Sequence, residues 1–374
     1  MQININNKEG NNYTKSNKDD VKQFDILNCT NYEKKDIFFF SSYIKPNLGL
    51  NYNNQNSQIN NCNSNHFFKN EQNALIDIVY LLKNNLNINS YIHLLDRLNY
   101  EDFSKMFSFI LNNVDIFISN SQSIALINKI INLFNQKNFN DNKENTNNIN
   151  ENIYSFLFSF FNKNILSLIQ SNNYIYSVNN LVIKLGFPKN DFIYNELVND
   201  FKTFALNRQG CILIQNLFPL GNEIQKINFL NKIIEHCNEL IVDKYGHYLF
   251  KYLLYKEANQ EKYYFQIFNK IINDVKKYTN NKYSSVVIER LLDSSNPFIK
   301  DKIIEKICLN ENDIIDLLYH AYGNYVLQKI IKVTKDNNIL EMIYKTIMKN
   351  KTSLNKLSYG KKILKEISSA YTLK

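Results

Sequence analysis

The sequence has 374 residues and a formal net charge of +9, from 44 basic and 35 acidic residues. This length allows two or three globular domains or one long repeat array, and the modest positive charge is compatible with an anionic partner such as nucleic acid. The five cysteines stand apart without a CxxC pair, so neither a disulfide framework nor a zinc site is indicated, and a reducing compartment is favoured.

No targeting or membrane segment is predicted. The N-terminal MQININNKEG lacks the charged start and the apolar run of a signal peptide. The most apolar stretch, Ile153 to Phe161, is too short to cross a bilayer, which takes roughly 20 residues. We therefore expect no contact with a membrane.

The composition and the hydrophobic pattern of the chain change near residue 70. Residues 1–70 are Asn-rich and of low complexity, which predicts a largely disordered segment or a degenerate cap. Residues 71–374 read as short amphipathic helices joined by polar loops, interrupted at about 135–152 by an Asn-rich tract without apolar period, which predicts a loop insertion. Proline is scarce and no apolar–polar alternation of strands is present, so the fold class is all-α.

A repeat appears where glycine recurs in one kind of segment. Four of the eight glycines, Gly210, Gly246, Gly323 and Gly360, open such segments, and Ser284 takes the same place in another. These segments recur at intervals of 36 to 39 residues. A period near 37 residues with two helices in each repeat is typical of an α-solenoid. Glycine suits the entry to the second helix because a turn there can use positive φ or a close backbone approach.

Each segment carries a polar pair on one face. In AYGNYVLQKIIK, Asn324 and Gln328 are four residues apart and therefore lie one above the other, with Tyr325 beside them. Such a set can hydrogen-bond to and stack on a flat ligand. A single segment of this kind would be an ordinary surface helix, and the recurrence is what favours a binding function.

The successive runs CILIQ, HYLFK, SVVIE and NYVLQ, followed by SYGKKILKEI, resemble the closing repeats and C-terminal cap of the Pumilio (PUF) RNA-binding family. The resemblance covers about residues 207–368. It implies a curved crescent of stacked helical repeats, each of which reads one base of a single-stranded RNA that runs antiparallel to the protein. In that family the first and fifth residues of the run contact the base edge, and the second stacks between bases.

The resemblance assigns two sets of site residues. The residues expected at base edges are Asn324, Gln328, Ser285, Glu289, His247, Lys251, Cys211 and Gln215. The residues expected to stack on bases are Tyr325, Val286, Tyr248 and Ile212.

The chemistry of three pairs agrees with the family's base code. Gln328 offers a donor and an acceptor that match O4 and N3–H of uracil, while Asn324 can reach O2. Ionised Glu289 only accepts, and guanine presents two adjacent donors, with Ser285 assisting. Cys211 with Gln215 is the family's pattern for adenine. These pairs predict a 5′ core of U-G-(U)-A.

The third position of that core stays open. His247 and Lys251 stand where the family would have Asn and Gln to read uracil. Lysine only donates, so it can meet O4 but leaves N3–H of uracil without a partner. Either this base is read loosely or Lys251 mainly meets a phosphate.

Upstream of residue 207 the resemblance fades. The runs NNLVI (179–183), SIALI (123–127) and SYIHL (90–94) fit the spacing, but their fifth residues are apolar. We therefore expect the helical repeats to continue back to about residue 70 without sequence-specific base contacts.

The resemblance implies a sequence-selective single-stranded RNA-binding protein that acts on mRNA 3′ untranslated regions and regulates translation or decay. It would act as a cytoplasmic monomer through recruited co-repressor or deadenylase proteins. One alternative is a nucleolar PUF-like ribosome-biogenesis factor that binds structured RNA; another is a protein-binding scaffold of armadillo or HEAT type. The Asn–Gln and Ser–Glu pairs argue against both.

No enzyme is predicted. The five histidines show no HExxH or similar ligand spacing, and no Gly-rich phosphate loop, G-x-S-x-G motif or paired catalytic carboxylates are present. We therefore expect no catalytic residues, no metal site and no cofactor.

Overall fold

The computed structural model describes residues 92, 95, 100–120, 123–134, 143–172, 174–256 and 261–372. The chain divides into two units, Met1–Cys62 and Asn63–Lys374, and all of the described residues belong to the second. The expected N-terminal segment 1–70 and the SYIHL run, apart from Ile92, lie outside the described residues.

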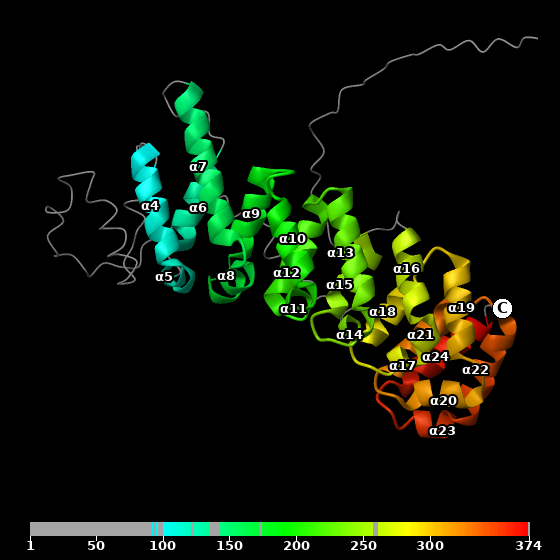
Figure 1. Ribbon diagram of the computed structural model, residues 1–374. Coiled ribbons are helices and arrows are strands. Elements are labelled where there is room, and N and C mark those ends of the chain that lie inside the picture. The colour runs from blue at the N-terminus through cyan, green and yellow to red at the C-terminus, as the bar shows by residue number, and fades with distance from the viewer. Residues whose placement is uncertain are drawn as a thin grey trace, which may run out of the picture. The chain divides into compact units, whose positions relative to one another are not determined.

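The described part of the second unit is built from seven successive groups of three helices (Figure 1). The first helices of the groups are α4 (Tyr100–Asn112), α7 (Lys143–Phe161), α10 (Asp191–Asn199), α13 (Glu223–Glu235), α16 (Glu261–Ile271), α19 (Pro297–Ile307) and α22 (Asn337–Lys349). The short middle helices are α5 (Val114–Ser119), α8 (Ile165–Asn172), α11 (Phe201–Ala205), α14 (Cys237–Leu240), α17 (Val275–Thr279), α20 (Glu311–Tyr319) and α23 (Lys351–Leu354). The third helices are α6 (Ser123–Leu133), α9 (Ile175–Leu185), α12 (Arg208–Leu217), α15 (His247–Lys256), α18 (Ser284–Leu291), α21 (Gly323–Val333) and α24 (Gly360–Thr372).

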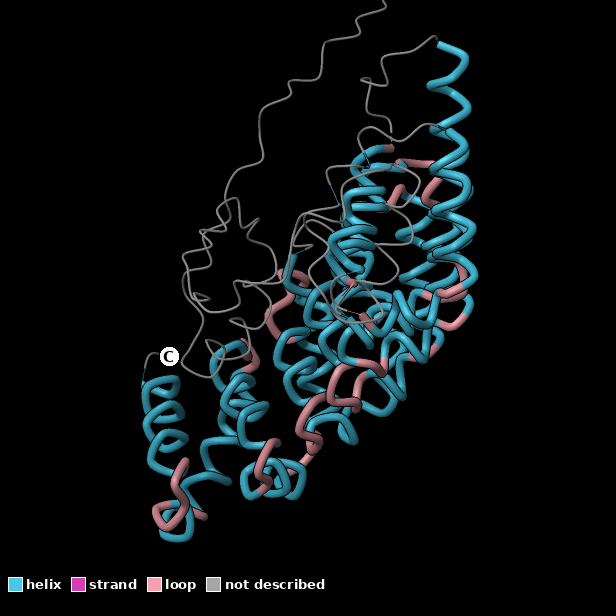
Figure 2. The backbone as a smooth tube through the Cα atoms, turned by 90° about the vertical axis from the view of Figure 1, so that its left-hand side faces the viewer, coloured by secondary structure: helices cyan, strands magenta, loops and turns pink. Residues whose placement is uncertain are grey.

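The third helices form one continuous row, because each packs against the third helix of the next group from α6 to α24. First helices also contact their successors, for example α4 with α7 and α10 with α13. Buried apolar side chains, above all Leu and Ile, fill the space between these layers in every group. Among the described residues the backbone is helical with short loops and contains no strand (Figure 2). The fold is an α-solenoid, in which each group contacts mainly its neighbours.

A close backbone approach to a carbonyl six residues earlier marks the start of α6, α12, α15, α18 and α24. A Cβ added at Gly246 would lie 2.7 Å from the carbonyl oxygen of Leu240, six residues earlier. Gly210 and Gly360 approach the carbonyls of Phe204 and Leu354 in the same way. Glycine is therefore required here by the lack of room for a Cβ. We call this place, occupied by Gly210, Gly246, Ser284, Gly323 and Gly360, the entry position.

Where serine occupies the entry position, its hydroxyl forms a hydrogen bond with the carbonyl six residues earlier. The Ser284 hydroxyl donates to the carbonyl of Tyr278, again six residues earlier, at 2.7 Å. The Ser123 hydroxyl donates to the carbonyl of Phe117 over the same interval. The hydroxyl thus satisfies a buried carbonyl, which stabilises the turn by about 1 kcal/mol for a typical hydrogen bond.

The residue three places before the entry position caps the turn. The Asp243 carboxylate accepts from the backbone N–H groups of Tyr245 and Gly246 at 2.7 and 2.8 Å. The same pair of contacts is made by Asn207, Asn281 and His320 in their groups. These side chains satisfy N–H groups that a helix start leaves without intrahelical partners.

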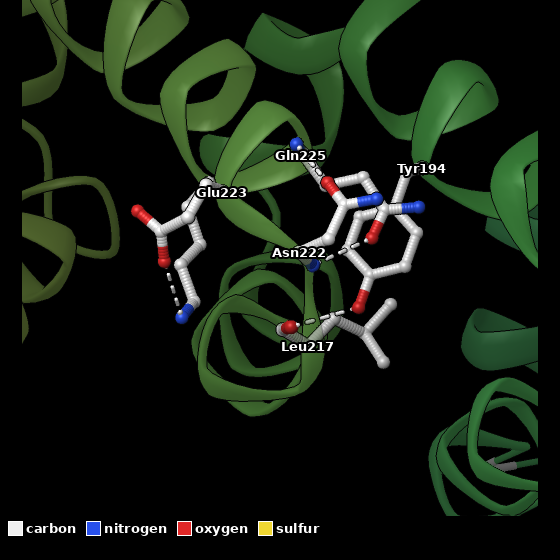
Figure 3. A network of polar contacts seen from close by, with 6 residues as sticks. Tyr194, Leu217, Asn222, Glu223 and Gln225 are labelled. Carbon is white, nitrogen blue, oxygen red and sulfur yellow. Dashed lines mark hydrogen bonds and ion pairs between the residues drawn. The ribbon is translucent and has the colours of Figure 1, made fainter. Parts of the chain in front are cut away.

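Polar contacts surround the start of α13 and the adjoining end of α12 (Figure 3). Asn222 and Gln225 form a capping box at the start of α13, each accepting from the other's backbone N–H at 2.9 Å. The buried Gln225 amide also donates to Asp191 of α10 at 2.9 Å, and the Tyr194 hydroxyl of α10 donates to the Leu217 carbonyl at 3.0 Å. The cap of α13 therefore also fixes its position on the preceding group.

Two details of the expected organisation are wrong. Each repeat contains three helices, because a short middle helix of four to nine residues follows the first. The second part of the Asn-rich tract at 135–152 is helical, since α7 begins at Lys143 and runs without a break into the apolar residues 153–161.

Among the described residues, no helix combines the length and the apolar character that a bilayer span needs.

Replacing Gly246 by Ala is expected to lower the free energy of unfolding by about 1 to 3 kcal/mol, because the new Cβ overlaps backbone atoms that cannot move independently. Urea unfolding followed by circular dichroism measures this change. The control is Asp316→Ala on the exposed side of α20, which should change stability by less than about 0.5 kcal/mol. A Gly246→Ala protein as stable as this control would show that the turn has room for a side chain.

Burial raises the pKa of the thiols of Cys211, Cys237 and Cys308 to about 12 in each case. At pH 8 these thiols are therefore neutral, and the thiolate is the nucleophile. We expect all three to resist iodoacetamide in the folded protein and to react completely in concentrated urea, as measured by mass spectrometry of peptides. Rapid labelling of the folded protein at these positions would contradict their burial.

Candidate nucleic-acid interface

The eight residues predicted at base edges lie on four neighbouring third helices, α12, α15, α18 and α21. Each pair occupies the places one and five residues after its entry position. Because these helices pack side by side and begin at equivalent points, the pairs line up from one helix to the next. We call these eight residues the polar row; they are Cys211, Gln215, His247, Lys251, Ser285, Glu289, Asn324 and Gln328.

The pair on α21 is tightly hydrogen-bonded. The Asn324 amide donates to the backbone carbonyls of His320 and Ala321 at 2.9 and 2.8 Å, and its oxygen accepts from Gln328 Nε2 at 3.0 Å. Both side chains are buried. Asn324 thereby fixes the orientation of the Gln328 amide. To contact O2 of uracil as predicted, the Asn324 amide must share the hydrogen that it donates to one of these two backbone carbonyls, or give up that hydrogen bond.

The pair on α12 has the same internal arrangement. Gln215 Nε2 donates to the Cys211 carbonyl and lies within hydrogen-bond distance of its Sγ, both at 3.2 Å. The Cys211 thiol donates to the carbonyl of Tyr245, just before the entry position of the next group, at 3.2 Å. The amide at the fifth place is thus held by the residue at the first place in both α12 and α21.

The pair on α15 gives a different chemistry. His247 Nδ1 lies 2.9 Å from the carbonyl oxygen of Asp243, which only accepts, so Nδ1 carries the hydrogen in this contact. In the neutral ring Nε2 is then an acceptor. Lys251 supplies donors, and its Nζ lies 5.2 Å from the centre of the Tyr248 ring. This pair therefore combines an acceptor on His247 with the donors of Lys251.

Residues two places after the entry position differ in their exposure. Tyr325 is 36% exposed, and Val286 and Tyr248 are half-buried. Ile212 is buried, so it offers the smallest surface. The Tyr248 ring lies 4.1 Å from that of His247, which in turn stacks 5.1 Å from Tyr283 of the next group. Aromatic surface is thus concentrated on α15 and α21.

The alignment expected upstream is wrong, because the burial of α9 places its entry position at Tyr174. In α18 the buried residues lie one, three, four, seven and eight places after the entry position. Counted from Tyr174, the buried residues of α9 fall at the same places: Ile175, Ser177, Val178, Leu181 and Val182. Tyr174 precedes Gly210 by 36 residues, within the range of the other intervals. The place five residues after entry is therefore Asn179, and Ile183, which is 63% exposed, lies beyond it.

A recurrent contact between groups supports this alignment. Lys332 Nζ, nine places after its entry position, lies 3.0 Å from Glu366, which is six places after Gly360. Lys329 of α21 and Asp293, just past the end of α18, pair at the same two places. Asn180 and Asn132 are hydrogen-bonded at 3.0 Å, and they occupy these places only if the entry positions are Tyr174 and Ser123.

On α6 the alignment shifts by one residue. The entry position is Ser123, whose hydroxyl contacts the Phe117 carbonyl, and the place five residues later is Asn128. Ile127, the fifth residue of the predicted run SIALI, is fully buried and lies four places after entry. The sequence did not reveal these two alignments because Ser123 and Tyr174, instead of glycine, occupy the two upstream entry positions.

Among the described residues, no group of three or more His, Cys, Asp or Glu could hold a metal ion.

Comparison with known proteins agrees with this architecture. The model of the Pumilio-family RNA binding repeat matches residues 201–234, 236–272, 279–308 and 313–347. Pumilio homology domain family member 4 of Saccharomyces cerevisiae is 29% identical over 43% of this chain, and Pumilio homolog 12 of Arabidopsis thaliana is 26% identical over 48%. The matched regions span 18% and 29% of the lengths of these two relatives.

Solved structures show the same fold. A Puf4 variant bound to the Cox17 RNA 3′ UTR recognition sequence is similar over 79% of this chain and 96% of that chain, with a TM-score of 0.62 and 19% identity. The RNA-binding domain of yeast Puf5p bound to SMX2 RNA is similar over 80% of this chain and 88% of that chain, with a TM-score of 0.60 and 19% identity. Residues 201–347 of this solenoid thus match four repeats of the Pumilio (PUF) RNA-binding family.

Proposed function

We propose that the chain is a sequence-selective single-stranded RNA-binding protein and that the polar row reads the bases. The observation that carries the proposal is the polar row itself, which places different hydrogen-bonding pairs at one repeated position in the family's repeats. A surface that only held the phosphate backbone would need positive charge but not amide, hydroxyl and carboxylate groups in fixed pairs.

The pairs support a core that reads U-G-(U)-A from α21 to α12. Gln328, held by Asn324, keeps one N–H and its carbonyl oxygen for O4 and N3–H of uracil. Glu289 with Ser285 accepts from the two donors of guanine. Gln215, held by Cys211, meets adenine at the fourth position. The third base, opposite His247 and Lys251, is left open.

Stacking supplies the second part of the affinity. Tyr325 and Tyr248 flank the positions of the first and third bases, and base–aromatic stacking contributes roughly 1–3 kcal/mol per base. Val286 and Ile212 give only flat apolar contact. The affinity should therefore depend unequally on the bases, with larger losses when Tyr325 or Tyr248 is removed.

We further propose that the RNA is mRNA and that the sites lie in 3′ untranslated regions, because the similar Puf4 structures are bound to 3′ UTR recognition sequences. The chain would then regulate translation or decay as a cytoplasmic monomer. It would act by binding and by recruiting a co-repressor or deadenylase, without catalysis of its own.

Glu289→Gln is expected to weaken selectivity for guanine at the second base by about 1–3 kcal/mol, because an amide replaces one acceptor by a donor that faces a guanine donor. Fluorescence anisotropy with UGUA- and UAUA-containing RNAs measures the ratio of affinities. Glu305→Gln on the exposed side of α19 is the matched control and should leave that ratio unchanged. Full retention of guanine selectivity in Glu289→Gln would show that α18 does not read this base.

A further inference from the structure

The pair on α15 is the member of the polar row that carries a lysine. In the other three pairs the fifth residue is an amide or a carboxylate, Gln215, Glu289 or Gln328, and each of these matches a particular set of donors and acceptors on a base edge. The Lys251 ammonium only donates. Every base edge offers it an acceptor and also presents a donor that opposes it, so an ammonium at this place gives no clear preference among the four bases.

The position of Lys251 also differs from that of the two amides. Asn324 and Cys211 hold the amides at the fifth place of α21 and α12. On α15 the Nζ of Lys251 lies over the Tyr248 ring, 5.2 Å from its centre, and His247 Nδ1 donates to a backbone carbonyl of its own turn. A lysine side chain is a flexible stem that ends in a compact point charge, so it can follow a ligand that moves it from the ring. Lys251 thus lies at the surface on which the third base is expected to stack.

A second lysine lies at the same set of rings. Tyr283 of the next group stacks on the His247 ring with 5.1 Å between the ring centres, and the His247 ring lies 4.1 Å from that of Tyr248. The exposed Lys282 has its Nζ 5.5 Å from the centre of the Tyr283 ring. The three rings therefore form one stack between α15 and the start of α18, with a lysine ammonium over each end ring. Two positive charges border the position of the third base.

Phosphate is the partner that suits two cations that only donate. A phosphodiester carries a full negative charge and only accepts, and a single strand brings one with every nucleotide. Glu289 lies at the fifth place of the neighbouring helix α18 and repels this backbone. A cation at Lys251 offsets that repulsion between the second and third nucleotides. The charges on α15 therefore act on the RNA whichever base it carries there.

We infer that α15 binds the third nucleotide by its backbone and by stacking, and does not read its edge. The base stacks on Tyr248, while Lys251 and Lys282 bind the phosphates that flank it. The core selected by the polar row is then U-G-N-A, in which N is any base. This inference rests on the proposed RNA binding, and it departs from the family's pattern, in which Asn and Gln at the places of His247 and Lys251 read uracil.

The test uses the full chain and four RNAs that differ only at the third position, UGUA, UGAA, UGCA and UGGA. Their affinities, measured by fluorescence anisotropy, should agree within about fivefold, whereas the change from UGUA to UAUA at the second position should cost about 5- to 150-fold. Lys251→Gln places an amide at the fifth place, as in α12 and α21. It should therefore introduce a preference of about 10-fold or more for uracil or adenine over guanine at the third position.

Salt dependence measures the phosphate contacts directly. Lys251→Gln and Lys282→Gln should each reduce the slope of log Kd against log salt concentration by about 0.7, the value for one phosphate contact on a single strand. Lys306→Gln on the exposed side of α19 removes the same charge away from the row and is the matched control, with an unchanged slope. Unchanged slopes in both Lys251→Gln and Lys282→Gln would overturn the phosphate contacts.

A preference of the unmodified chain for one base at the third position by more than about fivefold would overturn the inference, because His247 and Lys251 would then read the edge together. This comparison needs no variant to fold. If the chain distinguished UGUA from UAUA but also selected the third base, only this inference would fall. If it did not distinguish UGUA from UAUA, the proposed function itself would fall.

Discussion

The close approach of α6, α12, α15, α18 and α24 to a carbonyl six residues before the entry position is the contact on which the rest of the solenoid depends. At Gly246 there is no room for a Cβ, and at Ser284 the side chain uses the approach for a hydrogen bond. The cap three residues before entry holds the same turn from the other side. Together these contacts set where each third helix begins, so residues at equal distances from the entry position lie at equivalent heights along the row.

Because of this constraint, residues that recur at a fixed interval in the sequence lie on the same side of successive third helices. Places three, four, seven and eight residues after entry are buried between groups and are apolar in nearly every case. The places one and five residues after entry lie on a different side and carry the polar row. Buried polar groups need partners, and in α12 and α21 they find them within the pair. The amides are therefore oriented before any ligand arrives, which lowers the entropy lost on binding.

The fold could be predicted from the sequence where glycine marked the entry positions. Gly210, Gly246, Gly323 and Gly360 gave the alignment of the later groups, and the all-α solenoid follows from it. The middle helices were missed because a segment such as Cys237–Leu240 is too short to show a helical period. The helical start of α7 was missed because Asn, Lys and Glu carry no apolar pattern, although the chain runs directly into the apolar residues 153–161.

The upstream part of the candidate site could not be aligned from sequence, because Ser123 and Tyr174 replace the glycine on which the alignment depended. Tyr174 is fully buried, and its hydroxyl lies 2.7 Å from that of Ser123 and donates to the Phe117 carbonyl at 3.2 Å. The two unusual entry residues thus contact each other across neighbouring groups. Only the three-dimensional contacts reveal that the polar residues following them are Asn128 and Asn179.

The most direct measurement of the central claim is selection of RNA from a random pool with the full chain. The polar row predicts enrichment of unstructured sequences that share a UGU-like core followed within one nucleotide by adenine. Enrichment of hairpins without a common sequence would contradict base reading by the row and would instead favour recognition of RNA structure.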